Sequence, residues 1–206
     1  MSELVLGIDT IGRGGSVALA DESGVVGIQT HDPDLGYAEE LFGLFDDLLA
    51  DCGRERRELT AVAVLSGPGS FTGLRIGVMT AKTLAFGLGL PLLAAPTLDL
   101  VAAAAGPGRW TAAADAGGDM LWAAPFEVDA SRVEPLGPVR RVAPDAIEGE
   151  VVSAPPVRIG HPVDGLAGPL AALAARRRPP LGEVDPLALV PEYAAVSQAE
   201  RVHGLD

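Results

Sequence analysis

Apolar residues recur along the first half of the chain with two different periods. Residues 3–9, 16–20 and 24–30 are short β-prone segments separated by Gly-rich or Asp-Glu-Ser-Gly turns, and this arrangement predicts an antiparallel meander. Residues 59–65 form an apolar run rich in β-branched side chains, which is typical of a strand covered on both faces. A further strand is predicted over 91–96. Helical patterns between these segments favour an α/β fold.

Two long helices are predicted between these strands. The first, Tyr37 to Cys52, has apolar residues at helical spacing on one face, and others extend the apolar surface around the helix. This surplus has two open interpretations, which are burial in the protein core and an oligomer interface. The residues concerned are Tyr37, Leu41, Phe42, Leu44, Phe45, Leu48 and Leu49. The second pattern, Gly73 to Gly87, is apolar on nearly every face, which predicts a mostly buried helix.

The second half of the chain is richer in irregular segments. Thr97 is expected to cap a helix over Leu98–Ala105, and Gly106-Pro107-Gly108 marks a domain boundary. We therefore expect an N-terminal domain over 1–105 and a smaller domain over 106–206. Its predicted elements are strands over 110–114, 121–128 and 138–142, and a helix over Gly168–Arg178 whose closing Arg176-Arg177-Arg178 complements the helix dipole.

A glycine-rich turn joins the strand at 59–65 to the second helix. We call it the motif turn, and it comprises Ser66, Gly67, Pro68, Gly69, Ser70, Phe71, Thr72, Gly73, Leu74 and Arg75. Its glycines permit positive φ or close backbone approach, and Ser70 or Thr72 can cap the helix. A Walker loop needs a lysine here, but Lys82-Thr83 lies within the helix, and Thr72 replaces the third glycine of a dinucleotide fingerprint. A ligand-holding loop and a structural or partner-facing turn both remain open.

Composition favours a small globular protein rather than a nucleic-acid binder. The chain has 206 residues, 48% of them hydrophobic, which is ample for a core. Its formal net charge of −13 argues against direct binding of nucleic acid, because such binding depends on Lys and Arg side chains that contact the phosphates. The N-terminal residues are not basic, and no uninterrupted apolar run reaches the ~18 residues of a membrane span. We expect a cytoplasmic protein without membrane contact.

Residues typical of catalysis are sparse. Cys52 is the single cysteine, and no His or Asp pattern accompanies it, which favours a half-buried thiol over a nucleophile. His31, His161 and His203 lie far apart in the sequence. Neither a His-Glu-x-x-His motif nor a Gly-x-Ser-x-Gly elbow occurs. We therefore expect no catalytic residue, no metal site and no cofactor, which argues against a peptidase.

The motif turn and its surroundings resemble one protein family. Ser66 to Gly77, continuing through Phe86 to Pro91 and Pro96-Thr97-Leu98, is similar to the TsaB family, which has the older label YeaZ and is described as glycoprotease-like. The first two predicted strands resemble the family's opening, so the likeness spans residues 4 to about 100. Three positions depart from the family pattern. Tyr37 stands where a histidine is expected, residues 114–122 lack an arginine, and Pro191-Glu192-Tyr193 only echoes a terminal Pro-x-Tyr motif.

This resemblance implies a role in tRNA modification. TsaB proteins are partner subunits in bacterial biosynthesis of threonylcarbamoyladenosine, and they share the two-domain fold of the actin, sugar-kinase and Hsp70 ATPase superfamily, which is ribonuclease H-like. The implied partners are a TsaD-like catalytic subunit and a TsaE-like ATPase, with tRNA contacted only through the complex. The resemblance also implies a bundle built on the first two helices, and a homodimer when the chain is alone. A small-molecule kinase or ATPase of the same fold is the alternative.

Asp9 and Thr10 are the weak candidates for a nucleotide site. In ATPase members of the superfamily, an Asp at the end of the first strand lies near metal and phosphate. The other interpretation of Asp9 is an Asx turn, in which its carboxylate accepts a bond from the backbone of Ile11 or Gly12. The two interpretations predict different partners for one carboxylate.

Overall fold

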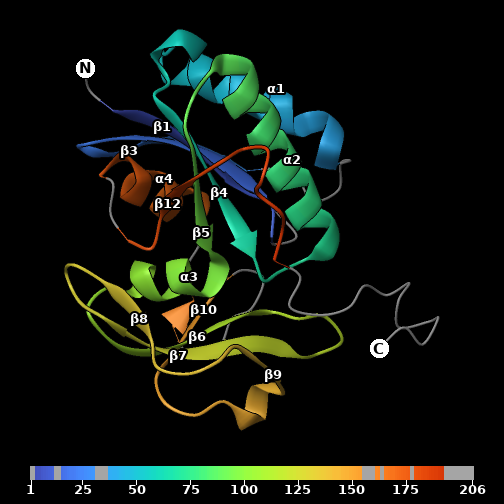
Figure 1. The fold of residues 1–206 in the computed structure, drawn as a ribbon, viewed down its shortest axis with the longest axis vertical. Helices are drawn as coiled ribbons and strands as arrows, with labels where there is room; N and C mark the ends of the chain where they lie inside the picture. Colours follow the sequence, from blue (N-terminus) through green and yellow to red (C-terminus); the bar gives the residue numbers. More distant parts are fainter. Residues whose placement is uncertain are drawn as a thin grey trace.

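Two β-sheets and four α-helices make up the computed structural model, which describes residues 3–11, 15–30, 37–154, 161–162, 165–176 and 179–192 (Figure 1). The first sheet has the strand order β12-β5-β4-β1-β2-β3. Its strands are β1 (Leu4–Asp9), β2 (Ser16–Asp21), β3 (Gly24–Thr30), β4 (Ala61–Gly67), β5 (Leu92–Pro96) and β12 (Gly182–Val184). Strands β1, β4 and β5 are parallel, whereas β1, β2 and β3 form the predicted antiparallel meander.

The second sheet lies on the far side of a central helix. Its order is β11-β10-β6-β7-β8, and β9 also pairs with β7. Its strands are β6 (Gly108–Asp115), β7 (Leu121–Val128), β8 (Val133–Pro135), β9 (Arg140–Val142), β10 (Val151–Ser153) and β11 (His161–Pro162). Two short 3-10 helices, η1 (Arg56–Glu58) and η2 (Pro144–Ala146), lie in connections.

Helices cover both faces of the first sheet. On one face lie α1 (Tyr37–Asp51) and α2 (Phe71–Leu88), and on the other lies α4 (Ala167–Ala175). The remaining helix, α3 (Thr97–Ala105), packs on β6 and β7 and so lies between the two sheets (Figure 1). A Cβ at Gly7 would lie 2.7 Å from the carbonyl oxygen of Ala167, so α4 rests directly on the backbone of β1. The two sheets share one apolar core through α3 and α4.

Strand alternation explains which residues face which helices. Leu4, Leu6 and Ile8 of β1 point to the side of α1 and α2, while Val5 points to the side of α4. Both sets are buried, because helices cover the two faces of the sheet. Fully burying such a side chain stabilises the fold by about 1.5–3 kcal/mol.

Several sequence-based expectations need correction. The prediction that α2 is mostly buried is wrong, because the helix packs on β4 only through a face containing Leu74, Val78, Ala81 and Ala85. Thr97 does not cap α3, since Pro96 is the N-cap and the buried Thr97 hydroxyl has no hydrogen-bond partner. The last helix ends at Ala175 rather than Arg178, and residues 177 and 178 lie outside the described part. Strand β12 was not predicted. A division at residue 105 stays a prediction.

Candidate functional site

The motif turn packs tightly on the end of β1. Strand β4 ends at Gly67, whose φ is +120°, and Ser70 then caps α2 by accepting a hydrogen bond of 3.3 Å from the amide of Gly73. The Thr10 hydroxyl donates to the carbonyl oxygen of Gly73 at 2.7 Å. A Cβ at Gly73 would collide with the carbonyl oxygen of Thr10. The glycine is therefore needed for close packing between α2 and the end of β1, which supports the structural interpretation of the turn.

Asp9 is bonded to protein backbone through both carboxylate oxygens. Its Oδ1 accepts from the Ile11 amide at 3.0 Å, which confirms the predicted Asx turn. Its Oδ2 accepts from the Leu166 amide at 3.4 Å, at the start of α4. Burial raises the pKa of Asp9, and the two backbone hydrogen bonds oppose that rise. Asp9 and Thr10 thus tie β1 to α4 and α2 respectively.

No cluster in the described ranges has the donors of a metal site. Within the residues described, no group of three or more His, Cys, Asp or Glu side chains could hold a metal ion. His31, His203 and the side chain of His161 lie outside that part. Cys52 has a half-buried free thiol, as predicted. No helix among the described residues is long and apolar enough to cross a membrane.

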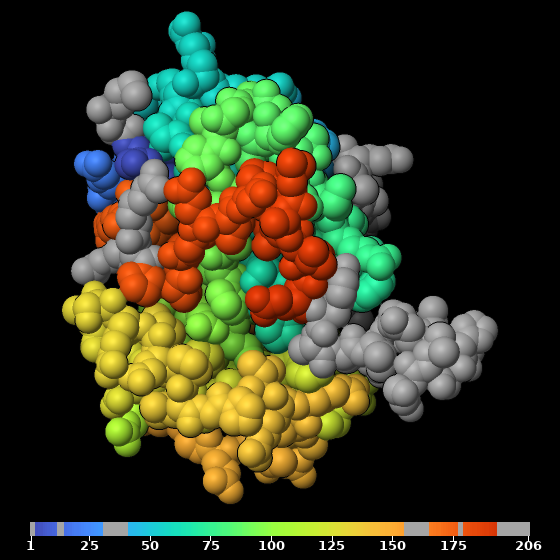
Figure 2. All heavy atoms as spheres, in the orientation of Figure 1, coloured from blue at the N-terminus to red at the C-terminus, as the bar shows by residue number. Residues whose placement is uncertain are grey.

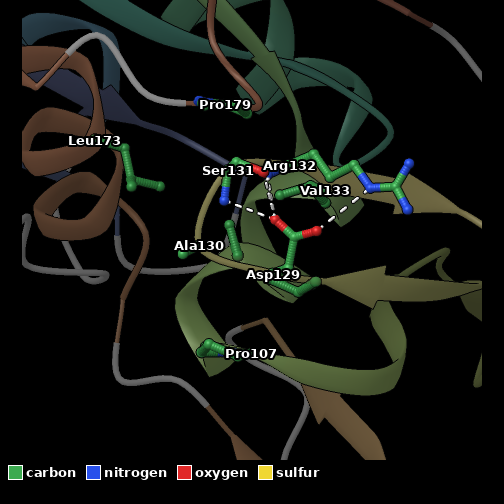
Figure 3. Close-up of a pocket in the computed structure, with 11 residues that line it drawn as sticks. Pro107, Asp129, Ala130, Ser131, Arg132, Val133, Leu173 and Pro179 are labelled. Carbon is green, nitrogen blue, oxygen red and sulfur yellow. Dashed lines mark hydrogen bonds and ion pairs between the residues drawn. The ribbon is translucent and has the colours of Figure 1, made fainter.

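A cavity of ≈ 280 Å³ lies between the end of α3, the β7–β8 turn and α4 (Figure 3). Asp129 lines it, but its Oδ1 accepts hydrogen bonds of 2.7 Å from the Ser131 amide and 3.0 Å from the Arg132 amide. The Ser131 side chain also bonds this carboxylate, and together these bonds lower the pKa of Asp129. The acidic group therefore stabilises its own turn, and the remaining lining is mostly apolar.

The outer surface of α1 and α2 exposes large apolar side chains. Phe42 of α1 is 44% exposed, and Met79, Phe86 and Leu88 of α2 are 58%, 72% and 39% exposed. Met79 and Phe86 are seven residues apart and lie on one helical face. Leu88 follows Met79 by nine residues and so lies on the opposite side of α2. We call Phe42, Met79 and Phe86 the helix surface. Large apolar side chains exposed on the outer side of these helices are candidates for contact with a partner protein.

Most of the candidate interface residues on α1 instead face the core. Leu41, Phe45, Leu48 and Leu49 are buried, and Leu44 is half-buried against the same cluster. The side chain of Tyr37 lies outside the described part. The sheet beneath α1 explains the apolar character of Leu41, Phe45, Leu48 and Leu49. Of the candidate residues described, Phe42 is therefore the one that is available to a partner. Met79, Phe86 and Leu88 were not on the sequence-based list, because a helix apolar on nearly every face does not reveal which face is covered.

Comparison with known proteins places this geometry in a fold class. A solved structure from Pseudomonas aeruginosa, titled as an uncharacterized protein with similarity to peptidase YEAZ, has a TM-score of 0.74 and 26% sequence identity. The superposition covers 94% of this chain and 100% of that chain. The fold is therefore the predicted actin-like α/β fold, which is ribonuclease H-like.

Sequence comparison identifies the family. Residues 27–155 match the family model described as TsaD, tRNA N6-adenosine threonylcarbamoyltransferase. The chain is 36% identical over 124 residues to the Escherichia coli tRNA threonylcarbamoyladenosine biosynthesis protein TsaB, covering 58% of this chain and 53% of that protein. The Bacillus subtilis protein of the same name is 35% identical over 99 residues, covering 48% and 43%. The chain belongs to the TsaD family and, within it, to the TsaB (YeaZ) proteins.

The matches also relate this chain to the transferase. The tRNA N6-adenosine threonylcarbamoyltransferase of Paracoccus denitrificans is 41% identical over 83 residues, covering 38% of this chain and 22% of that protein. The chain spans about half the length of the curated TsaB relatives that it matches. The family-model match at residues 27–155 includes α1, the motif turn and α2.

Proposed function

We propose that this chain is a non-catalytic subunit that binds a TsaD-like transferase and supports threonylcarbamoyl transfer to adenosine in tRNA. The exposed helix surface is the observation that carries this proposal, because Phe42, Met79 and Phe86 are large apolar side chains left uncovered among the described residues. The polar candidates Asp9 and Thr10 form bonds within the protein. The proposed role of the chain is therefore association rather than chemistry.

The proposed arrangement joins related helices of two related proteins. Because this chain resembles the transferase across the segment that contains α1 and α2, we expect the equivalent helices of both subunits to pack together as a bundle. Covering a Phe or Met side chain stabilises an interface by about 1.5–3 kcal/mol. The same surface pairs two copies of this chain when the transferase is absent. In this proposal a TsaE-like ATPase joins the complex, and tRNA is held by the partners because this chain is acidic.

Binding measurements with a charged variant test the proposal. Phe86→Glu should weaken binding to the TsaD-like subunit by at least about tenfold, because a carboxylate would be desolvated without a partner. Leu136→Glu is the matched control, since Leu136 is 48% exposed next to the second sheet and away from α2. Equal binding of the wild type and both variants would contradict the proposed surface.

Reconstituted tRNA modification tests the role itself. Threonylcarbamoyladenosine formation by the TsaD-like enzyme, the TsaE-like ATPase and a threonylcarbamoyl-adenylate source should require this chain. Full modification in its absence would reject the proposal. ATP turnover by the isolated chain that is abolished by Asp9→Ala would instead favour the kinase or ATPase alternative.

A further inference from the structure

A segment near the C-terminal end of the described chain crosses beside α2. We call residues 185–192 the strap, which follows β12 and is drawn in orange-red to red in Figures 1 and 2. The ammonium group of Lys82, on α2, donates to the carbonyl oxygen of Leu189 at 2.9 Å. The amide of Glu192 donates to the carbonyl oxygen of Ser66 at 2.7 Å. The strap is thus attached both to α2 and to the motif turn.

The strap has one buried side and one exposed side. Leu189 packs against the apolar core between the first sheet and α1 and α2. Its neighbours Leu187 and Val190 are 76% and 66% exposed. Lys82 lies three residues after Met79 and four before Phe86, so its bond places the strap beside the helix surface. Single exposed apolar residues need no explanation, but Leu187 and Val190 lie within two residues of Leu189, whose carbonyl oxygen contacts α2 between Met79 and Phe86.

Lys82 is chemically unusual in this sequence. It is the single lysine, whereas the other basic side chains are arginines. An ammonium on a slender stem can reach one carbonyl beside packed apolar groups, while the planar guanidinium of arginine is broader and prefers bidentate partners. The lysine is half-buried at the contact. These features suit a residue that holds the strap at one point.

We propose that the strap is the third element of the surface that receives the TsaD-like subunit, and that Lys82 is the positioning residue that holds it there. This inference rests on the proposed function. Charge supports the choice of occupant, because the exposed residues Glu183, Asp185 and Glu192 lie in or beside the strap, and the exposed Asp47 lies on α1. A protein that holds tRNA needs basic surface for the phosphates. Acidic side chains near the exposed apolar residues complement such a partner.

Charged substitutions on the strap test its contact with the partner. The full chain carrying Leu187→Glu or Val190→Glu should bind the TsaD-like subunit about tenfold more weakly, with an unchanged midpoint of thermal unfolding. Leu136→Glu again serves as the control. If Phe86→Glu weakens binding and both strap variants bind like the wild type, the strap inference fails while the proposed function stands. If the wild type does not bind the TsaD-like subunit, the proposed function fails. If the strap variants associate with themselves more weakly but bind the TsaD-like subunit normally, the inference is also overturned.

A second variant tests the anchoring role of Lys82. Lys82→Met removes the ammonium but keeps an apolar stem, so the amide of Glu192 should exchange with deuterium faster, and transferase binding should weaken. Arg140→Met, an exposed change of equal charge in the second sheet, should alter neither measurement. Faster exchange spread evenly through β1 and β4 would indicate a merely structural role for Lys82 and overturn the assignment. Unchanged exchange at Glu192 would do the same.

Discussion

The end of β1 and the outer face of α2 use their side chains in opposite ways. At the end of β1, the buried polar groups of Asp9 and Thr10 are bonded to backbone atoms of the protein itself. On α2, Met79 and Phe86 are large, apolar and exposed. The first region satisfies all of these polar groups internally, whereas the second leaves apolar area in contact with water. Internal packing explains the first region, whereas the second is the surface that we propose receives a partner.

The largest expected contrast is between two phenylalanines of α1. Phe45 is 1% exposed and Phe42 is 44% exposed. Phe45→Ala should lower the free energy of unfolding by about 3–5 kcal/mol, because it leaves a cavity in the core. Phe42→Ala should change it by less than about 0.5 kcal/mol, yet weaken transferase binding. Urea unfolding and a binding titration measure the two effects. Similar losses of stability in both variants would remove the distinction between the two faces.

Two glycines of α2 provide the next contrast. Gly73→Ala should destabilise the fold by about 1–3 kcal/mol, because the new methyl group would collide with the carbonyl oxygen of Thr10. A Cβ at Gly87 would meet nothing within 4 Å, so Gly87→Ala should stabilise the protein by up to about 1 kcal/mol. Chemical unfolding of both variants checks the difference. If Gly73→Ala leaves the free energy of unfolding unchanged, the tight packing described for the motif turn is contradicted.

The smallest expected effect concerns pH. Burial raises the pKa of Asp99 to about 6, and Glu192 of the strap adds repulsion. Because the folded pKa exceeds the unfolded value of 3.8, the folded state binds more protons, so stability should fall as pH rises from 3.8 to about 6. Partial solvent exposure limits this loss to about 1 kcal/mol.

Asp99→Asn should flatten that pH dependence. Asp119→Asn, which changes an exposed carboxylate in the second half of the chain, is the matched control. Unfolding free energies measured between pH 4 and 7 decide the question. A fall of equal size in the wild type and the Asp99→Asn variant would show that another group is responsible.

The sequence predicts local features better than long-range ones. The meander and the Asx turn at Asp9 were predictable, because each depends on residues close together in the chain. Strand β12 pairs Gly182 with Ala94, and only three residues form it, so neither composition nor alternation indicates it. The bond between Asp9 and Leu166 is equally non-local.

The candidate surface was predicted only in part. Periodicity on α1 identifies an apolar helix, but it does not show that the sheet covers Leu49 while leaving Phe42 exposed. On α2, the apolar residues on nearly every face concealed the fact that only one face packs on β4. The contact between Lys82 and Leu189 joins residues 107 positions apart, and no local pattern contains that information. Which side of a helix is covered is a property of tertiary packing.

The position of α4 has a consequence for synthesis on the ribosome. All five strands β1 to β5 have been synthesised once Pro96 is added, but the helix that covers one face of β1 is complete only when Ala175 has been added. At about 5–20 residues per second, this interval lasts roughly 4–16 s. During that time Val5 and the backbone of Gly7 lack the helix that covers them in the folded protein.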